Sequence, residues 1–308
     1  MRLNDESPKP PLHGSAVCAV LVTYHPDSTL AQRLERVAPQ VGAIVIVDNG
    51  SSDTESRMLQ QIAARPNVHL QLNLQNLGVA RALNLGVQRA ISLGYSLALL
   101  LDQDTCVEAD MVATLLGIYG SFANCERLAV VGSNYRDVNR PAPDSNGPAP
   151  PAASWLEAET VITSGSLLPL AAHAQIGPFR EEFFIDFVDT DYCLRAKAKG
   201  YSVIKSRKPL MSHAIGALRE SRFLWFRRWT YNHSPDRRYY IARNNTVLLR
   251  EYGQPGRMRW LLKSLNRCFR LSKRVVLYEK SRTRKIAAIV EGWRDGVTGR
   301  MGPRSRIE

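Results

Sequence analysis

The sequence predicts an α/β fold with a mostly parallel sheet that helices cover on both faces, followed by a basic helical appendage. Three observations support this prediction. Short apolar runs alternate with segments of helical periodicity over the first two thirds of the chain. The apolar runs are nearly continuous, as in strands that are buried on both faces. Polar residues follow several runs directly, at the sheet edge where ligands bind in open α/β sheets.

The predicted elements alternate in the order that βα units require. Each early strand is a short aliphatic run, and each early helix follows a turn rich in Asn, Asp, Ser or Gly. The expected elements are, in order, strand 16–23, helix 30–38, strand 43–47, helix 54–64, strand 69–72, helix 79–93, strand 96–101, a helix from Met111, strand 159–162 and a helix after Phe183 that ends at Gly200.

Composition divides the chain into three regions. Residues 1–15 are polar and contain proline, which predicts a disordered tail rather than a secretory signal. Residues 16–250 carry the α/β pattern, and residues 140–154 within them are rich in Pro, Ala and Ser, which predicts a mobile surface loop. Residues 251–308 are basic and predict an amphipathic helical region.

Charge and cysteine content limit the possible functions. Residues 1–206 hold 16 Lys and Arg against 21 Asp and Glu, whereas residues 207–308 hold 25 against 7. The basic part is suited to nucleic acid, an anionic membrane leaflet or substrate phosphates. The five cysteines are scattered without a C-x-x-C pair, and no stretch is apolar enough to span a bilayer, so a cytoplasmic protein with reduced thiols is expected.

Two carboxylates follow the fourth predicted strand. Asp102 and Asp104 are two positions apart, so on an extended chain they face the same way, about 7 Å apart. Such a pair can bridge a divalent cation and a ligand. The alternative is that Asp104 only caps the helix that begins near Met111.

Polar turns also follow the second and third predicted strands. Asp48 and Asn49 lie where short side chains can bind a base or a ribose, although an ordinary βα turn is the alternative. Asn76 and Gly78 open the next helix, whose N-terminal N–H groups can meet a diphosphate. The chain has no G-x-G-x-x-G and no G-x-x-x-x-G-K-[ST], which argues against a dinucleotide oxidoreductase and a P-loop enzyme.

A second acidic cluster comprises Asp186, Asp189 and Asp191, among bulky apolar residues. Mutual repulsion and lost hydration tend to raise the pKa of a carboxyl group toward the range of a general base. A solvated cluster that caps a helix is the alternative. Further along, His213 is either a metal ligand or a structural histidine.

The order and spacing of these segments resemble the inverting family-2 glycosyltransferases of the GT-A fold, over about residues 17–250. The matching elements are Thr23-Tyr24, V-D-N-x-S-x-D at 47–53, N-x-G-x-A-x-A-x-N-x-G at 76–86, D-x-D at 102–104, Thr-Ser-Gly at 163–165, D-x-D-x-x-x-R at 189–195, His213 and Arg243-Asn244. Many members have Glu where this chain has Val188. The segments at 24–27, 102–104 and 184–189 resemble the rhamnosyltransferase branch.

The resemblance implies a role for each candidate residue. Asp102, Asp104 and His213 would hold Mg²⁺ or Mn²⁺, and Asp189 would be the general base, with Asp191 in reserve. The donor would be dTDP-L-rhamnose, and the acceptor a hydroxyl of a growing bacterial surface polysaccharide such as O-antigen, or of a lipid-linked oligosaccharide. The donor-binding residues would be Thr23, Tyr24, Asp48, Asn49, Asn76, Gly78, Asp102 and Arg243, or another arginine of the basic segment in place of Arg243.

The basic C-terminal region leaves two interpretations open. Its apolar residues at 258–269 recur on one helical stripe with arginines and lysines between them, which suits a helix lying on an anionic membrane. The alternative is a helix that packs on the catalytic domain with a solvated basic face. A nucleic-acid-binding protein, a nucleotidyltransferase and a catalytically silent scaffold are the competing functions. The first does not account for the acidic clusters, so no nucleic acid is expected as a partner.

Overall fold

The computed structural model describes residues 13–137, 154–213, 219–223, 226–230, 232–253 and 257–304. Most of the expected tail at residues 1–15, namely residues 1–12, lies outside these ranges. So do residues 140–153 of the expected loop at residues 140–154.

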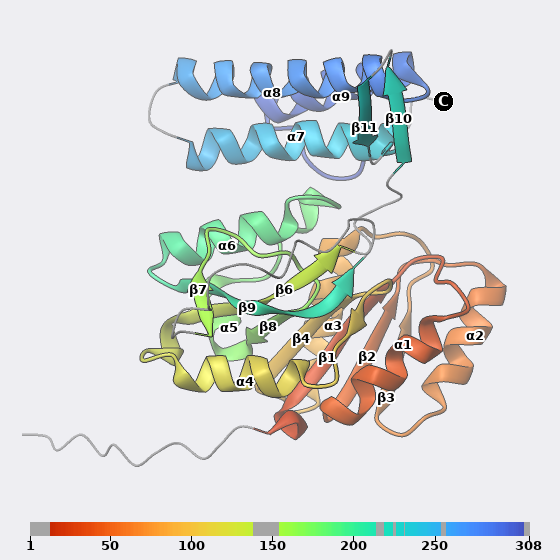
Figure 1. Ribbon diagram of the computed structural model, residues 1–308, viewed down its shortest axis with the longest axis vertical. Helices are drawn as coiled ribbons and strands as arrows, with labels where there is room; N and C mark the ends of the chain where they lie inside the picture. The colour runs from red at the N-terminus through yellow and green to blue at the C-terminus, as the bar shows by residue number, and fades with distance from the viewer. Residues whose placement is uncertain are drawn as a thin grey trace, which may run out of the picture.

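Four parallel strands form the first half of a nine-stranded sheet (Figure 1). They are β1 (Val17–Thr23), β2 (Ala43–Asp48), β3 (Val68–Leu72) and β4 (Leu97–Asp102), in the order β3-β2-β1-β4. Thr23 pairs with Asp48 and Val22 pairs with Asp102, so the polar residues at the ends of these strands meet at one edge. This half of the sheet follows the predicted order of strands and helices.

The second half of the sheet is mixed. Its strands are β5 (Cys106–Val107), β6 (Leu128–Asp137), β7 (Trp155–Glu157), β8 (Ser166–Pro169) and β9 (Ser202–His213). The pairs β4–β8, β6–β8, β5–β9 and β7–β9 are antiparallel, whereas β6–β9 is parallel. The mostly parallel arrangement therefore holds as far as β4.

No strand forms at residues 159–162, where one was expected. The strand in this region is β7, which ends at Glu157. The carbonyl of Ile162 accepts a hydrogen bond from the hydroxyl of Ser166 at 2.7 Å, so it closes a turn instead of joining a ladder. The apolar residues Val161 and Ile162 pack against the core from this irregular segment.

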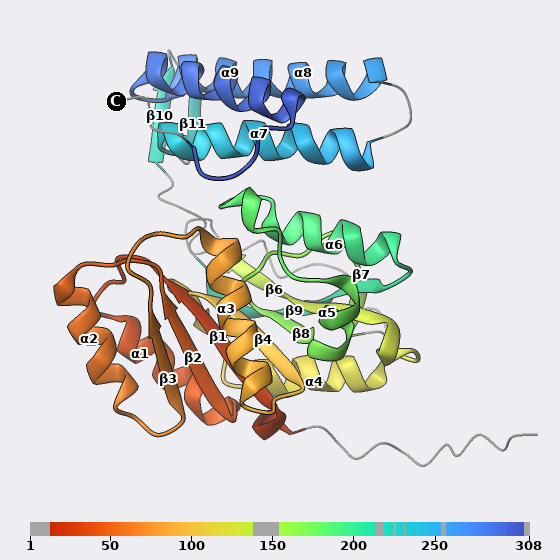
Figure 2. The same cartoon turned by 180° about the vertical axis from the view of Figure 1, so that it is seen from behind.

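Helices cover both faces of the sheet (Figures 1 and 2). One face packs against α1 (Leu30–Val37), α2 (Asp53–Ala63) and α4 (Met111–Ser121), and the other against α3 (Val79–Ser92), α5 (Leu170–Ile176) and α6 (Val188–Ala198). Alternate strand residues enter the two cores, because successive side chains point to opposite faces. Short 3₁₀ turns lie at Gly14–Ala16 (η1), Ala38–Gln40 (η2), Cys125–Arg127 (η3) and Glu181–Phe183 (η4).

The C-terminal part forms a separate helical layer above α6 (Figure 1). A hairpin of β10 (Arg219–Phe223) and β11 (Phe226–Thr230) precedes α7 (Pro235–Tyr252), α8 (Arg257–Tyr278) and α9 (Arg282–Thr298). The expected boundary after residue 250 falls inside α7, which packs on α8 and α9. Within the described ranges, every helix is too short or too polar to cross a membrane.

Close packing explains why α7 belongs to this layer. Gly292 on α9 lies against α7, because a Cβ atom there would come within 2.2 Å of the carbonyl oxygen of Tyr239. The Tyr239 hydroxyl donates to a carboxylate oxygen of Asp295 at 2.8 Å, and both side chains are buried. The start of α7 is capped by the Ser234 hydroxyl, which accepts from the backbone N–H of Arg237.

Candidate active site

A cleft of about 750 Å³ opens at the carboxyl ends of the parallel strands. Its walls come from the ends of β1 and β4, the turn after β2, the start of α3, the segment before α6, and helices α7 and α8. The predicted site residues that line it are Thr23, Tyr24, Asn49, Asn76, Gly78, Asp102, Asp104 and Asp189. Arg237 and Arg267 also line the cleft, and neither was among the predicted site residues.

A larger hollow of about 1490 Å³ lies elsewhere, beside η1, η2 and α4. Its lining is mainly apolar, and the described residues that form it include no carboxylate. The candidate carboxylates Asp102, Asp104 and Asp189 line the smaller cleft instead.

Asp48 holds the turn after β2 against the end of β1. Its side chain is buried and accepts hydrogen bonds from the Thr23 hydroxyl at 2.9 Å and from the backbone N–H of Ser51 at 2.9 Å. Asp48 does not line the cleft, in contrast to the expectation that it binds the donor directly. It holds the strand ends together, and the adjacent Asn49 reaches the cleft instead.

Asn49 and Asn76 form one hydrogen-bonded unit. The Asn49 amide donates to Oδ1 of Asn76 at 2.9 Å, and its own Oδ1 accepts from the backbone N–H of Leu77 at 3.0 Å. The Gly78 N–H donates to Oδ1 of Asn76, and the Val79 N–H donates to the carbonyl of Phe184 at 2.7 Å. These N–H groups at the start of α3 already have protein acceptors, so side chains rather than free N–H groups form this wall.

The Asp102–Asp104 turn is tied to two other segments. Gln103 accepts from the backbone N–H of Tyr24 at 2.7 Å and donates to its carbonyl at 3.1 Å. The Ser164 hydroxyl accepts from the Asp102 N–H at 3.1 Å. Gln103 therefore has a structural role, because it holds the Asp102–Asp104 turn against the backbone of Tyr24. Its position between the two acids did not predict this role. The two flanking acids both line the cleft.

Carboxylate oxygens are the hard ligands that Mg²⁺ and Mn²⁺ prefer, so the donor chemistry of Asp102 and Asp104 fits either ion. Among the described side chains, no group of three or more His, Cys, Asp or Glu is arranged to hold a metal. The third predicted ligand, His213, is described only by its backbone at the end of β9, where the preceding Ser212 pairs with Cys106. That pairing brings the end of β9 close to the turn after β4.

Asp189 lies half-buried near the start of α6. One carboxylate oxygen accepts from the backbone N–H of Thr163 at 3.1 Å, and the other from the N–H of Thr190 at 2.7 Å. Burial raises the pKa of Asp189, and the charge of Asp186 acts in the same direction, whereas these hydrogen bonds lower it. A cleft-lining carboxylate with a raised pKa is suited to accept a proton.

Asp186 is paired with an arginine of α7. The Arg237 guanidinium donates to both carboxylate oxygens of Asp186, with distances of 3.1 to 3.3 Å. Burial raises the pKa of Asp186, and the Arg237 charge partly opposes this shift. The pair brings a cation into the cleft wall from the C-terminal layer.

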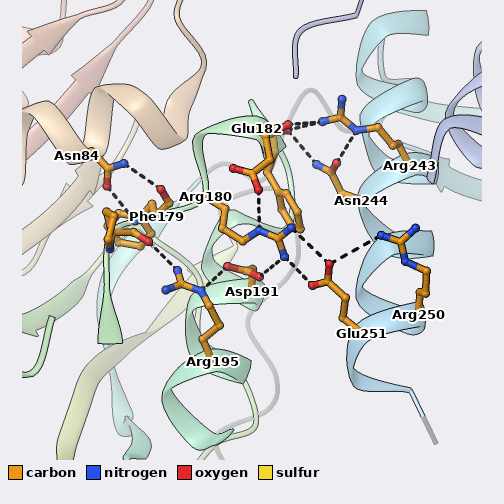
Figure 3. Close-up of polar contacts among 12 residues, drawn as sticks. Asn84, Phe179, Arg180, Glu182, Asp191, Arg195, Arg243, Asn244, Arg250 and Glu251 are labelled. Atoms are coloured by element: carbon orange, nitrogen blue, oxygen red, sulfur yellow. Dashed lines mark hydrogen bonds and ion pairs between the residues drawn. The ribbon is translucent and has the colours of Figure 1, made fainter. Parts of the chain in front are cut away.

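Asp191 does not reach the cleft, so the structure argues against its reserve role as the base. Its side chain is fully buried and accepts from Arg195 at 2.8 Å and from Arg180 at 3.2 Å (Figure 3). Positions two apart on a helix point to different sides, so Asp189 and Asp191 cannot share one surface. Asp191 joins α6 to the arginines around it.

Arg243 also lies outside the cleft, in contrast to the expected contact with a diphosphate. It is fully buried and donates to the carbonyl of Glu182 at 2.8 Å (Figure 3). It also donates to the carbonyls of Phe183 at 3.1 Å and of Gly302. The basic segment does supply cleft arginines, but they are Arg237 and Arg267. Sequence alone could not choose among these arginines, because the choice depends on how α7 and α8 are rotated.

Comparison with known proteins adds two findings on the sequence. Residues 18–142 match the family described as glycosyl transferase family 2. The dTDP-rhamnosyl transferase RfbF of Shigella flexneri is 27% identical over 258 residues, which cover 78% of this chain and 82% of that protein.

Two solved structures resemble most of this chain. S. aureus TarS superposes with a TM-score of 0.57 at 15% identity over 92% of this chain, which spans 49% of the TarS chain. A mannosyltransferase of Pyrobaculum calidifontis, solved with GDP-Man and Mn²⁺, gives a TM-score of 0.58 at 13% identity and covers 96% of this chain and 90% of that one. At these identities the likeness concerns the fold alone, and it confirms the predicted fold class.

Proposed function

Because the chain is a glycosyltransferase with a family 2 domain at residues 18–142 and a GT-A fold, we propose that its cleft transfers a sugar from a nucleotide donor to a hydroxyl group with inversion. The main support is that Asp102, Asp104 and Asp189, from segments far apart in the sequence, line one cleft. A single displacement needs a base on the acceptor side and charge neutralisation on the leaving-group side.

We propose dTDP-L-rhamnose as the donor, because the Shigella relative is described as a dTDP-rhamnosyl transferase. Thr23, Tyr24, Asn49 and Asn76 line the strand side of the cleft. There they would contact the nucleoside and its ribose. The acceptor would be a hydroxyl of a bacterial surface polysaccharide such as O-antigen, or of a lipid-linked oligosaccharide.

Asp102 and Asp104 would hold a divalent cation, Mg²⁺ or Mn²⁺, and His213 remains the proposed third ligand. When bound, the ion would neutralise the negative charge that grows on the departing nucleoside diphosphate. The protein's own part is to hold the two acids on one turn, which Gln103 and Ser164 anchor through the backbone of Tyr24 and Asp102. Arg237 and Arg267, from α7 and α8, also line the cleft and would add positive charge to it.

Asp189 would accept the proton of the attacking hydroxyl at a carboxylate oxygen. The Thr163 and Thr190 N–H groups hold this carboxylate in one orientation, and each oxygen retains further acceptor capacity. The raised pKa of Asp189 keeps the group basic enough to take the proton as the new bond forms. No covalent sugar–enzyme intermediate is needed.

The surface of α8 supports the proposal that the protein contacts an anionic membrane at the inner face of the plasma membrane. One side of α8 packs on the neighbouring helices through Cys268, Leu271 and Val275. Another side exposes an apolar stripe, with Phe269 68% and Leu262 56% exposed. The same helix carries further exposed basic residues that do not line the cleft: Arg259, Lys263, Arg270, Lys273 and Arg274. An apolar stripe with basic flanks suits an interfacial helix.

Membrane contact is tested by co-sedimentation with vesicles of phosphatidylcholine alone or mixed with phosphatidylglycerol. The wild type is expected to bind the anionic vesicles, and Phe269→Ser with Leu262→Ser is expected to weaken that binding. Val290→Ser, at an exposed position on α9, is the matched control. Equal binding to both vesicle types, or unchanged binding by the double variant, would contradict the contact.

The catalytic proposal is tested with a panel of dTDP-, UDP- and GDP-sugars in a thermal shift assay, with and without Mn²⁺. A donor that binds the folded state raises the melting temperature by mass action, and dTDP-L-rhamnose with Mn²⁺ is expected to give the largest rise. The product that forms when rhamnose is transferred to an acceptor hydroxyl is then analysed by NMR, which gives the anomeric configuration of the new glycosidic bond. A retained configuration, or no shift with any nucleotide sugar, would contradict the proposal.

A further inference from the structure

We propose that Asn244, held in place by Arg243, is a positioning residue that fixes Asp189, the proposed base, through the loop before α6. This inference rests on the function proposed above for Asp189. The loop comprises residues 184–187 and is called the acidic loop here, because it contains Asp186 and leads directly to Asp189. Asn244 lies on α7, beyond residues 18–142, over which the chain matches glycosyl transferase family 2.

The acidic loop has an unfavourable backbone conformation. Phe184, Asp186 and Phe187 have φ angles of 65°, 64° and 65°, in the left-handed region that side chains with a Cβ atom disfavour. Three such residues within one short loop remain left-handed only where the surrounding structure holds them. Such strain often marks a site whose geometry matters for function.

The Asn244 side chain supplies much of this restraint. Its amide nitrogen lies 3.0 Å from the carbonyl oxygen of Phe183 and 2.9 Å from those of Ile185 and Asp186. These three carbonyls share the two hydrogens of one amide group, so the backbone must curl around it. The side chain of Asn244 is fully buried, which excludes water as a substitute donor.

Arg243 fixes the orientation of that amide. Its Nε donates to Oδ1 of Asn244 at 2.9 Å, so the amide nitrogen must face the acidic loop. Its guanidinium also donates to the carbonyls of Glu182 and Phe183, immediately before the loop (Figure 3). The two residues thus act together on the backbone from residue 182 to residue 186.

The acidic loop also contacts the start of α3, on the side of the cleft that would bind the donor. The N–H of Val79 donates to the Phe184 carbonyl at 2.7 Å. A Cβ atom on Gly78 would lie within 2.7 Å of Phe184, so the contact depends on glycine. The loop is therefore held between α3 and α7, and α7 also binds the Asp186 side chain through Arg237. Without Asn244, the loop would relax toward right-handed conformations and displace Asp189.

The test compares Asn244→Ala and Asn244→Asp with Asn245→Ala. Asn245 is the adjacent, half-buried asparagine of α7, and no side-chain hydrogen bond is found for it in the described structure. Asn244→Asp keeps the shape of the side chain and the contact with Arg243, but it replaces the donor by a carboxylate that faces three carbonyls. We measure amide hydrogen exchange of residues 183–190, binding of dTDP, and the pH dependence of kcat.

Both Asn244 variants are expected to exchange the 183–190 amides faster, with β1 and β4 unchanged. The kcat is expected to fall by about 10²-fold, as for a reacting group that is displaced by about an ångström, while the Kd for dTDP stays within about twofold. The acid limb of the kcat profile moves, because the burial of Asp189 changes. Asn245→Ala is expected to match the wild type in all three measurements.

Unchanged hydrogen exchange at 183–190 in the Asn244 variants would overturn the inference. A parallel loss of dTDP binding and kcat would overturn it too, since that pattern indicates general unfolding. If Asn244→Ala does not fold, Asn244→Asp and the exchange measurement still decide. If the wild type does not use dTDP-L-rhamnose, that result contradicts the proposed donor but not the role of Asn244. Hydrogen exchange and dTDP binding can both be measured without turnover.

Discussion

The carboxylate of Asp189 accepts a hydrogen bond from the backbone N–H of Thr163 at 3.1 Å, across 26 residues of sequence. The neighbouring Ser164 hydroxyl accepts from the N–H of Asp102 at 3.1 Å. Two consecutive residues before β8 therefore hold both the proposed base and the first acid of the proposed metal site. Both residues lead into one turn, in which Gly165 has a φ of 75°.

Asp189→Asn is expected to lower kcat by about 10²–10⁴-fold, because it removes the general base. Binding of dTDP should remain close to that of the wild type, since the strand side of the cleft is untouched. Steady-state kinetics and calorimetry measure the two effects. Asp53→Asn, at an exposed position on α2, is the control. Near-normal turnover by Asp189→Asn would exclude Asp189 as the base.

The raised pKa of Asp189 predicts a pH dependence of both activity and stability. Because the ionised form is required, kcat is expected to fall as the pH drops through a value above the ordinary aspartate pKa of about 4. Ionisation costs more in the folded than in the unfolded state, so the wild type loses stability relative to Asp189→Asn as the pH rises through this range. Urea unfolding should show the variant to be the more stable at pH 7.5, with the difference shrinking toward pH 4. A difference independent of pH would contradict the shift.

Asp104→Asn is expected to weaken metal-dependent donor binding. Loss of a charged metal ligand should weaken the metal-dependent binding of the donor roughly tenfold or more. Mutating a residue that only hydrogen-bonds to a metal ligand already weakens metal binding by about that factor. Calorimetric titration of dTDP with Mn²⁺ and with EDTA measures the effect, and Asp110→Asn on the exposed surface is the control. Donor binding by the wild type that is indifferent to EDTA would contradict a metal at this turn.

Asp191→Asn is expected to lower the free energy of unfolding rather than to act on catalysis directly. It leaves Arg180 and Arg195 without their shared buried carboxylate, and breaking such a buried pair costs roughly 3 kcal/mol. Chemical denaturation measures this loss, and the folded fraction should still bind dTDP. A variant with wild-type stability and a large loss of kcat would return Asp191 to the catalytic role.

Gly78→Ala is expected to disturb the acidic loop from the side of α3. The added methyl group would meet Phe184, and Gly78 itself has a φ of 85°, so the free energy of unfolding should fall by about 1 kcal/mol or more. Displacement of the loop should also lower kcat, by up to about 10²-fold. Gly94→Ala has a similar φ but open space around it, so it should cost stability without loss of kcat. Equal kcat values for the two variants would contradict the contact.

Much of the first half of the fold follows from local patterns. The runs that became β1 to β4 and the helices between them were predicted within one or two residues, because burial on both faces leaves strands continuously apolar. The strand expected at 159–162 was wrong because its apolar residues are buried from an irregular segment. The apolar composition of this segment indicates only that it is buried. Whether it joins the sheet depends on hydrogen-bond partners that are far away in the sequence.

The candidate site divides in the same way. Residues at strand ends, such as Thr23 and Asp102, were predictable because parallel strands end at a common edge. Asp48 and Asp191 have the right residue type and position, but their carboxylates are used by Thr23 and Ser51 in one case and by two arginines in the other. Gln103 and Asn244 act on the backbones of other segments, which no local pattern reveals.

The sequence by itself determined the α/β class, the sheet edge where the acids gather and the basic character of the C-terminal helices. Only the tertiary structure decided that Arg237 and Arg267 reach the cleft while Arg243 is buried, and that Asp189 rather than Asp191 lines it. The physical reason is the distance along the sequence over which each property is set. Periodicity and composition report the face of each element that is buried, whereas side-chain contacts depend on how helices are rotated and docked, and many residues far apart in the sequence set that together.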